Sequence, residues 1–177
     1  DVLPHLRGWR PADDFPALGA VLNDGEAALT EFAASAKPEA TLAVVGCGTG
    51  IVVALQVAGV RLREHRPFSG ELGYAPYGHE GTFDEHASGH AVQTGQRDVQ
   101  EAAEAFGASL ATVLHVIHPE RIGLYGGALR HPGYLDTALA AMRRRSLPAL
   151  LADCEVGLMP EPELAVARGA LRAARRA

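Results

Sequence analysis

Cysteine, lysine and long apolar runs are all scarce in this chain of 177 residues. Its two cysteines, Cys47 and Cys154, are too few for a disulfide framework, so we expect a reducing, cytoplasmic setting. Lys37 is the only lysine among 16 cationic residues, and the net charge of −5 gives no basic surface for nucleic acid or an anionic membrane. No apolar run reaches the roughly 18 residues of a membrane span, and no signal peptide opens the chain.

The chain is long enough, and has enough hydrophobic residues, to form one domain that buries its own core. Residues 1–18 are rich in proline and charge and are expected to form an irregular lead-in. Apolar runs predict strands over 41–45, 51–58, 60–62 and 121–125 and within 149–159. Helical periodicity predicts helices over 26–35, 99–117, 134–144 and 163–175. With a long irregular segment over 69–89, this order favours an α/β fold with a mixed sheet flanked by helices.

The first motif with possible chemistry is Asn23-Asp24, at the start of a predicted helix. The structural interpretation is a helix N-cap, because Asn and Asp accept hydrogen bonds from the free N–H groups of the first turn. The functional interpretation is a general base that accepts a hydroxyl proton.

Two glycine-rich segments also have two interpretations each. Gly46-Cys47-Gly48-Thr49-Gly50 lies between predicted strands, and either forms a hairpin turn or brings its backbone close to a phosphate. It has neither the Walker A pattern nor the dinucleotide fingerprint. The pair at 126–127 either makes an ordinary strand-to-helix turn or lets backbone approach a nucleotide.

Acids and histidines are frequent in the irregular segment. Glu71 and Glu85 could accept hydrogen bonds from neighbouring hydroxyls of a polyol, or belong to a solvated acidic loop. His79, His86 and His90, with the nearby acids, do not reproduce the spacing of a tetrahedral site, so no metal site is expected. Both cysteines are expected to be buried small hydrophobic residues.

Taken in order, these segments resemble the ROK family of bacterial sugar kinases and sugar-responsive transcription regulators. The resemblance is carried by Leu-Asn-Asp-Gly-Glu-Ala-Ala at 22–28, Gly-Thr-Gly at 48–50, Ser-Gly-Glu-Leu-Gly at 69–73, Glu-His-Ala-Ser-Gly at 85–89, and His-Pro-Glu-Arg-Ile at 118–122 leading into Gly-Gly at 126–127. It covers nearly all of the chain but only the C-terminal part of a typical member. It implies an actin-like, ribonuclease-H-like lobe over 19–177, without the N-terminal phosphate-binding lobe.

On the sugar side, the resemblance implies roles for four residues, and a fifth position departs from the family. Asp24 matches the base that deprotonates the attacking sugar hydroxyl, and Asn23 matches its sugar-contacting neighbour. Glu71 and Glu85 match two glutamates that hold sugar hydroxyls. Tyr74 stands where the family usually has a sugar-binding histidine, which removes one expected sugar contact. Tyr74, Tyr77 or Phe83 could replace that contact by stacking, and we include Tyr74 among the expected substrate-binding residues.

On the nucleotide side, the resemblance implies that Gly48, Thr49 and Gly50 form the second phosphate loop. Gly126 and Gly127 match the adenosine-side glycines. The implied phosphate donor is ATP or polyphosphate, with Mg²⁺ to neutralise the phosphates.

The chain departs from the family pattern in further places, among them Glu26, which stands where a second Asn is usual. The usual Cys-x-Cys-Gly-x-x-Gly-Cys zinc cluster is absent, and Tyr74 and Glu85 are only 11 positions apart, so no structural zinc is expected. The Asp-x-Gly-Gly-Thr phosphate loop of a sugar kinase and the helix-turn-helix of a regulator do not occur in these residues either. The sequence also begins at Asp1 instead of Met, so we expect it to be part of a longer protein.

Three hypotheses follow from the resemblance. The leading one is the C-terminal lobe of a sugar kinase that phosphorylates a hexose or amino sugar. The alternative is the effector domain of a regulator, which binds a sugar without turnover and reaches DNA only through a domain outside this chain. The third is a domain that retains the fold and has lost the chemistry. The expected partners are a small sugar, the missing N-terminal lobe and a second copy in a homodimer, with no membrane.

Overall fold

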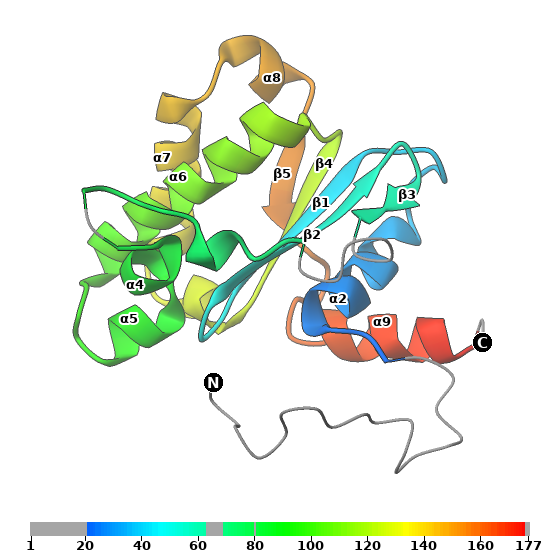
Figure 1. Ribbon diagram of the computed structural model, residues 1–177, viewed down its shortest axis with the longest axis horizontal. Coiled ribbons are helices and arrows are strands. Elements are labelled where there is room, and N and C mark those ends of the chain that lie inside the picture. The colour runs from blue at the N-terminus through cyan, green and yellow to red at the C-terminus, as the bar shows by residue number, and fades with distance from the viewer. Residues whose placement is uncertain (1–20, 63–68, 80, 176–177) are drawn as a thin grey trace.

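The structure is a computed structural model that describes residues 21–62, 69–79 and 81–175. The predicted lead-in at 1–18 lies outside these residues. Figure 1 shows a central sheet with helices on both of its faces. The predicted α/β fold, a mixed sheet flanked by helices, is therefore confirmed.

The described residues form one sheet with the strand order β3-β2-β1-β4-β5. The strands are β1 (Leu42–Cys47), β2 (Ile51–Val57), β3 (Val60–Arg61), β4 (Arg121–Tyr125) and β5 (Glu155–Leu158). β1 pairs antiparallel with β2 and parallel with β4, β4 pairs parallel with β5, and β2 pairs antiparallel with β3. The carboxyl ends of β1, β4 and β5 consequently meet at one edge of the sheet.

The helices divide between the two faces of the sheet, as Figure 1 shows: α4 to α7 lie on one side, and α2 and α9 lie on the other. Their bounds are α2 (Asp24–Ala33), α4 (Phe83–Ala87), α5 (Gly89–Gln93), α6 (Val99–Ile117), α7 (Tyr134–Arg145), α8 (Pro148–Ala152) and α9 (Ala165–Ala174), with 3-10 turns η2 (Leu72–Tyr74) and η3 (Gly127–Arg130). Within the described part of the chain, no helix has the length and apolar character needed to cross a membrane.

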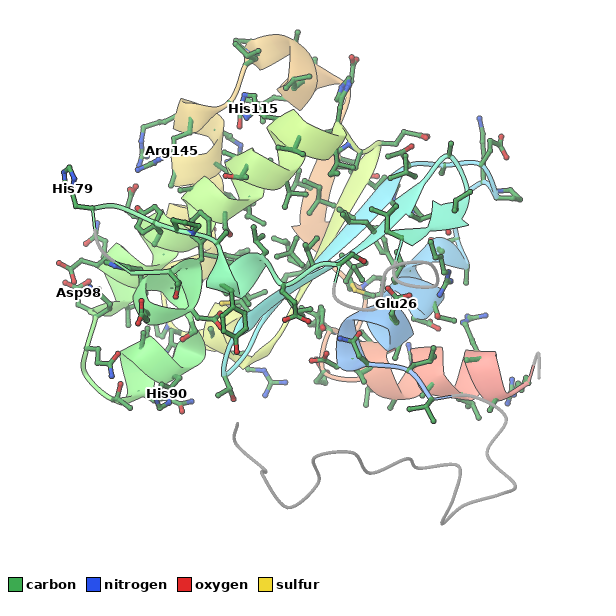
Figure 2. All side chains as sticks on the ribbon, viewed as in Figure 1. Glu26, His79, His90, Asp98, His115 and Arg145 are labelled. Carbon is green, nitrogen blue, oxygen red and sulfur yellow. The ribbon has the colours of Figure 1, made fainter. Side chains whose placement is uncertain are left out.

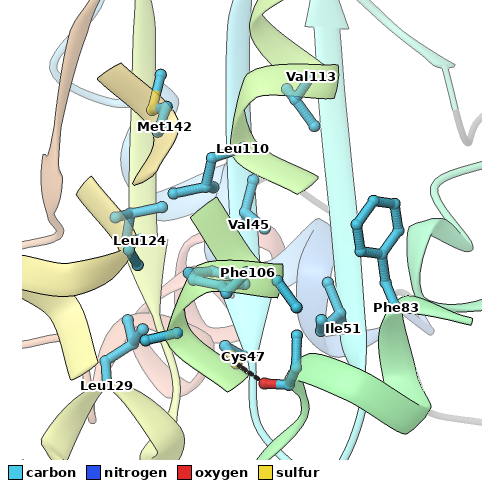
Figure 3. Packing of buried hydrophobic residues seen from close by; sticks show 14 of the residues in the cluster. Val45, Cys47, Ile51, Phe83, Phe106, Leu110, Val113, Leu124, Leu129 and Met142 are labelled. Atoms are coloured by element: carbon cyan, nitrogen blue, oxygen red, sulfur yellow. Dashed lines mark hydrogen bonds between the residues drawn. The ribbon is translucent and has the colours of Figure 1, made fainter. Parts of the chain in front are cut away.

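Side chains of β1 alternate between two apolar clusters, as strand geometry requires. Val45 and Cys47 pack towards α6, in the cluster drawn in Figure 3, whereas Leu42 and Val44 pack towards α2 and α9. The Cys47 thiol is fully buried beside the Tyr134 hydroxyl, at 3.3 Å. Burial raises the pKa of Cys47 to about 12, so this thiol is a core group, as predicted.

The long elements match the sequence prediction, and the short ones depart from it. The predicted helix over 99–117 and strand over 121–125 have the observed bounds of α6 and β4. β1 continues through Gly46 and Cys47, which were assigned to the turn. The segment expected to be irregular contains η2 and α4, because helices of three to five residues are too short to show periodicity.

Candidate functional site

A pocket of about 320 Å³ lies at the sheet edge where β1 and β4 end, beside the N-terminus of α2. Its lining residues are Asn23, Asp24, Gly46, Gly48, Thr49, Gly50, Ile51, Val52, Glu71, Asp84, Tyr125 and Gly126. In open α/β sheets, ligands bind outside the carboxyl ends of the strands. The pocket thus brings together several segments that the sequence singled out separately.

Asn23 and Asp24 reach the pocket because they begin α2. The Asn23 side chain accepts a hydrogen bond from the Glu26 N–H at 2.9 Å, so the N-cap interpretation is confirmed for Asn23. The Asp24 carboxylate accepts a hydrogen bond only from its neighbour Gly25 N–H, at 2.9 Å, among the hydrogen bonds between described residues. Asp24 is exposed and lines the pocket, so its carboxylate is positioned to contact a ligand.

The turn at 48–50 closes the hairpin between β1 and β2. The Gly48 N–H donates to the Gly50 carbonyl at 3.0 Å, and the Gly48 carbonyl accepts from the Gly89 N–H at 2.7 Å. A Cβ at Gly89 would be 2.7 Å from that carbonyl, so this contact with the start of α5 needs a glycine. The hairpin-turn interpretation is confirmed, and the turn also lines the pocket. Its predicted role with phosphate stays a prediction.

Asp84 is the acid that the sequence reasoning missed. Its carboxylate accepts a hydrogen bond from the Ile51 N–H at 2.6 Å, which ties α4 to the start of β2. Gly50 and Gly73 make room for it: a Cβ at Gly50 would lie 3.1 Å from one carboxylate oxygen, and a Cβ at Gly73 would lie 2.6 Å from the same oxygen. These contacts place the Asp84 carboxylate in the pocket wall together with Glu71.

The surroundings of Asp84 in this pocket change the pKa of its carboxyl. Burial raises the pKa of the Asp84 carboxyl above its ordinary value, and the charges of Glu71 and Glu85 raise it further. The hydrogen bond from Ile51 lowers this pKa, without cancelling the rise. Titratable groups perturbed by burial and a specific partner in a cleft are characteristic of functional sites.

Glu85 does not line the pocket, contrary to the expected pairing with Glu71. Its carboxylate accepts a hydrogen bond from the Thr82 N–H at 2.8 Å, while the Thr82 hydroxyl accepts one from the Glu85 N–H at 3.4 Å. This capping box at the start of α4 holds Glu85 in an exposed position, beside His86 and Arg97 in a separate shallow hollow. Adjacent residues on a helix do not share a face, so Asp84 enters the pocket instead.

Two other predicted residues also lie outside the pocket. Tyr74 is 74% exposed and is not part of the lining, so its expected contact with the same ligand stays a prediction. η2 is a single turn, and Tyr74 follows the buried Gly73 on its solvent side. Gly127 lines a neighbouring pocket of about 350 Å³, which also includes Arg130 and Glu163.

The histidines do not gather around a metal position. Figure 2 shows His79 and His90 at separate places on the surface, His79 in a loop and His90 on α5. Among the residues that the structure describes, no three His, Cys, Asp or Glu side chains are grouped so that they could hold a metal ion. The expected absence of structural zinc stays a prediction.

Tyr125 and Gly126 line the pocket at the end of β4. Gly126 has φ of +116°, and a Cβ there would be 2.6 Å from the Cys47 carbonyl carbon, so only glycine fits. The sequence predicts Tyr125 only as the last residue of the strand over 121–125. No sequence signal distinguishes its hydroxyl from that of an ordinary core tyrosine.

Comparisons with known proteins find no matching family model and no curated relative. Solved structures do match. A ROK hexokinase from Thermus thermophilus aligns with a TM-score of 0.70 at 24% identity, over 88% of this chain and 64% of that one. A ROK family transcriptional regulator, a homologue of the E. coli MLC protein, aligns with a TM-score of 0.72 at 17% identity, over 88% of this chain and 51% of that one.

A third match is a ROK family glucokinase from Streptomyces griseus in complex with glucose and AMPPNP, with a TM-score of 0.71 at 18% identity. It covers 94% of this chain and 70% of that one. The chain thus spans between half and about two thirds of the first two structures that it matches. Kinases and a regulator share this architecture, so the likeness establishes the fold but does not distinguish a kinase from a regulator. The chain has the fold of ROK family proteins, as its sequence motifs predicted.

Proposed function

We propose that the pocket at the ends of β1 and β4 binds a sugar. The observation that carries this proposal is its lining: the carboxylates of Asp24, Glu71 and Asp84 and the amide of Asn23 face a pocket of about 320 Å³. None of these described lining residues is Lys, Arg or His. Carboxylates are hydrogen-bond acceptors that suit neighbouring hydroxyl groups, whereas an anion would need a cation or many N–H donors.

For this sugar we propose phosphorylation, with Asp24 as the general base. Phosphoryl transfer depends on positioning and on removal of the proton from the attacking hydroxyl. An exposed carboxylate at the N-terminus of a helix suits both tasks. Asp24 projects from the first turn of α2, beside Asn23, which is fixed by its cap hydrogen bond. The hexokinase and glucokinase among the matching structures support this proposal.

The phosphate donor would approach the turn at 48–50, where Thr49 has a side-chain hydroxyl. The glycines there have no side chains, so a phosphate could come close to the backbone. ATP is the proposed donor, because one matching kinase is in complex with AMPPNP. Mg²⁺ usually takes only one or two carboxylates and completes its shell with phosphates and water, so it would be held mainly by the phosphates of the donor. The ion would neutralise charge on the phosphates.

A second candidate function is sugar binding without turnover, as in a regulator. It is favoured by the pocket lining, which holds acceptors for a neutral polyol and no cation for a phosphate among its described residues. The matching transcriptional regulator supports it as well. Both candidates require a sugar in the same pocket, and they differ in whether phosphate is transferred.

Heat stabilisation by a panel of hexoses and N-acetylhexosamines tests sugar binding. At about 100 times the dissociation constant a ligand stabilises a protein by about 2.7 kcal/mol, which raises Tm by roughly 5–10 °C for a chain of this size. Linear polyols at equal concentration are the control, because they stabilise proteins by exclusion from the surface. If no sugar exceeds its polyol control, the pocket does not bind sugars and the proposal fails.

A further inference from the structure

The Tyr125 hydroxyl is buried without a hydrogen-bond partner among the described residues. Tyr125 is only 6% exposed, and it is one of the residues that line the pocket. Buried polar groups are almost always paired, because an unpaired one loses its hydrogen bonds to water. A phenylalanine would fill the same space without that loss, so the hydroxyl calls for a partner outside the described residues, and its place in the pocket lining points to a ligand.

The position of this hydroxyl is fixed by its strand. Tyr125 is the last residue of β4 and lies opposite Gly46 of β1 in the parallel register. A Cβ at Gly46 would be 2.6 Å from the ring carbon that bears the hydroxyl and 2.7 Å from the oxygen itself. The ring therefore lies across Gly46, and glycine is required there because the tyrosine occupies the space of a side chain.

The chemistry of the pocket defines what this hydroxyl can do. Burial raises the pKa of Tyr125 above its ordinary value, and the charge of Asp24 raises it further, so the group keeps its proton and acts as a donor. The carboxylates of Asp24, Glu71 and Asp84 only accept when ionised. A ligand hydroxyl that donates to a carboxylate still has lone pairs on its oxygen, and Tyr125 is a donor for them.

We propose that Tyr125 donates a hydrogen bond to the oxygen of the sugar hydroxyl whose proton points to Asp24. This inference rests on the proposed sugar site and makes Tyr125 a specificity-determining residue for that one hydroxyl. A sugar without this hydroxyl leaves both the Tyr125 donor and the Asp24 acceptor without their ligand partner. Sites built to pair with a hydroxyl discriminate strongly against the deoxy analogue, because the buried groups are then unpaired.

Tyr125→Phe tests the inference first without any ligand. Since the hydroxyl has no partner in the described part of the chain, the variant should be at least as stable to heat as the wild type. Tyr134→Phe is the matched control, because the buried Tyr134 hydroxyl donates to the Ala87 carbonyl, and its loss should lower Tm. A fall in Tm for Tyr125→Phe like that of the control would show a structural partner and overturn the proposal.

Titration calorimetry with the sugar that stabilises the wild type completes the test. Tyr125→Phe should bind that sugar roughly tenfold or more weakly, and should lose much of the discrimination against one monodeoxy analogue. Unchanged affinity and unchanged discrimination, with a wild type that binds, would overturn the role of Tyr125 alone. If the wild type binds no sugar at all, the proposed function fails, and this inference fails with it.

Discussion

Replacing Asp24 with asparagine in the protein at its full encoded length is expected to lower sugar-dependent phosphoryl transfer by about 10²–10⁴-fold, the range for loss of a general base. Asparagine has nearly the same shape, and its side-chain oxygen can still accept the Gly25 N–H that Asp24 accepts at 2.9 Å. The start of α2 should therefore be unchanged. The affinity for sugar should fall much less than the rate, because only proton removal is lost. A coupled assay of kcat and KM measures both.

Glu31→Gln is the matched control for this experiment. It removes one negative charge from the same helix, at a residue that pairs with Arg172 of α9 and is not part of the pocket lining. We expect it to leave kcat unchanged. A wild-type rate in Asp24→Asn would show that Asp24 is not the base. A wild type that binds a sugar and transfers no phosphate would favour the second candidate, a binding domain without turnover.

Replacing Gly107 with valine is expected to destabilise the fold by about 3 kcal/mol or more, at the upper end of the usual effect of overpacking. Gly107 lies where α6 crosses α7, and a Cβ there would be 2.5 Å from the Ala141 Cβ and 3.0 Å from the Met142 nitrogen. No rotamer relieves a clash at Cβ, so the two helices would have to separate. Because they cover the buried face of β1 and β4, Tm should fall by roughly 6–12 °C.

Gly157→Val in β5 provides the control for the same substitution. A Cβ at Gly157 meets no atom within 4 Å, and valine suits a strand, so stability should be nearly unchanged. Intrinsic helix propensity favours valine over glycine, and so predicts the opposite sign at Gly107. Thermal unfolding of both variants decides between the two effects. Equal Tm values for Gly107→Val and the wild type would contradict the close crossing of α6 and α7.

The long elements could be predicted from sequence because their periodicity extends over many residues. α6 shows its buried face over 19 residues, and β1 and β2 are apolar runs on either side of a glycine-rich turn. The short helices α4, α5 and α8 have five residues each, fewer than two turns. Their bounds depend on capping residues and tertiary contacts, which periodicity does not detect.

The candidate site could be predicted in part. Asp24 and Glu71 belong to motifs, and the structure places both in one pocket. Glu85, which the motifs pair with Glu71, lies outside that pocket, and its neighbour Asp84 lines it. The signal that could have indicated this is local: Thr82 followed three residues later by Glu85 is a capping-box pattern, which commits Glu85 to the helix start.

Tyr125 illustrates what a sequence alone leaves undetermined. Its type and its place at a strand end are typical of a buried core residue. The unpaired state of its hydroxyl depends on the parallel register with Gly46 and on the approach of α2, which join segments about 80 and 100 residues apart. Long-range pairing of this kind is a property of the fold and not of any local pattern.

The central claim, that the pocket beside Asp24 is the sugar site, is tested most directly by sugar affinity in two matched variants. Asp84→Asn and Glu85→Gln remove one charge each from adjacent residues, and glutamine preserves the capping box of α4. By titration calorimetry with the stabilising sugar, we expect Asp84→Asn to weaken binding roughly tenfold or more. We expect Glu85→Gln to bind like the wild type. Wild-type affinity in Asp84→Asn, or weakened binding in Glu85→Gln alone, would contradict the assignment.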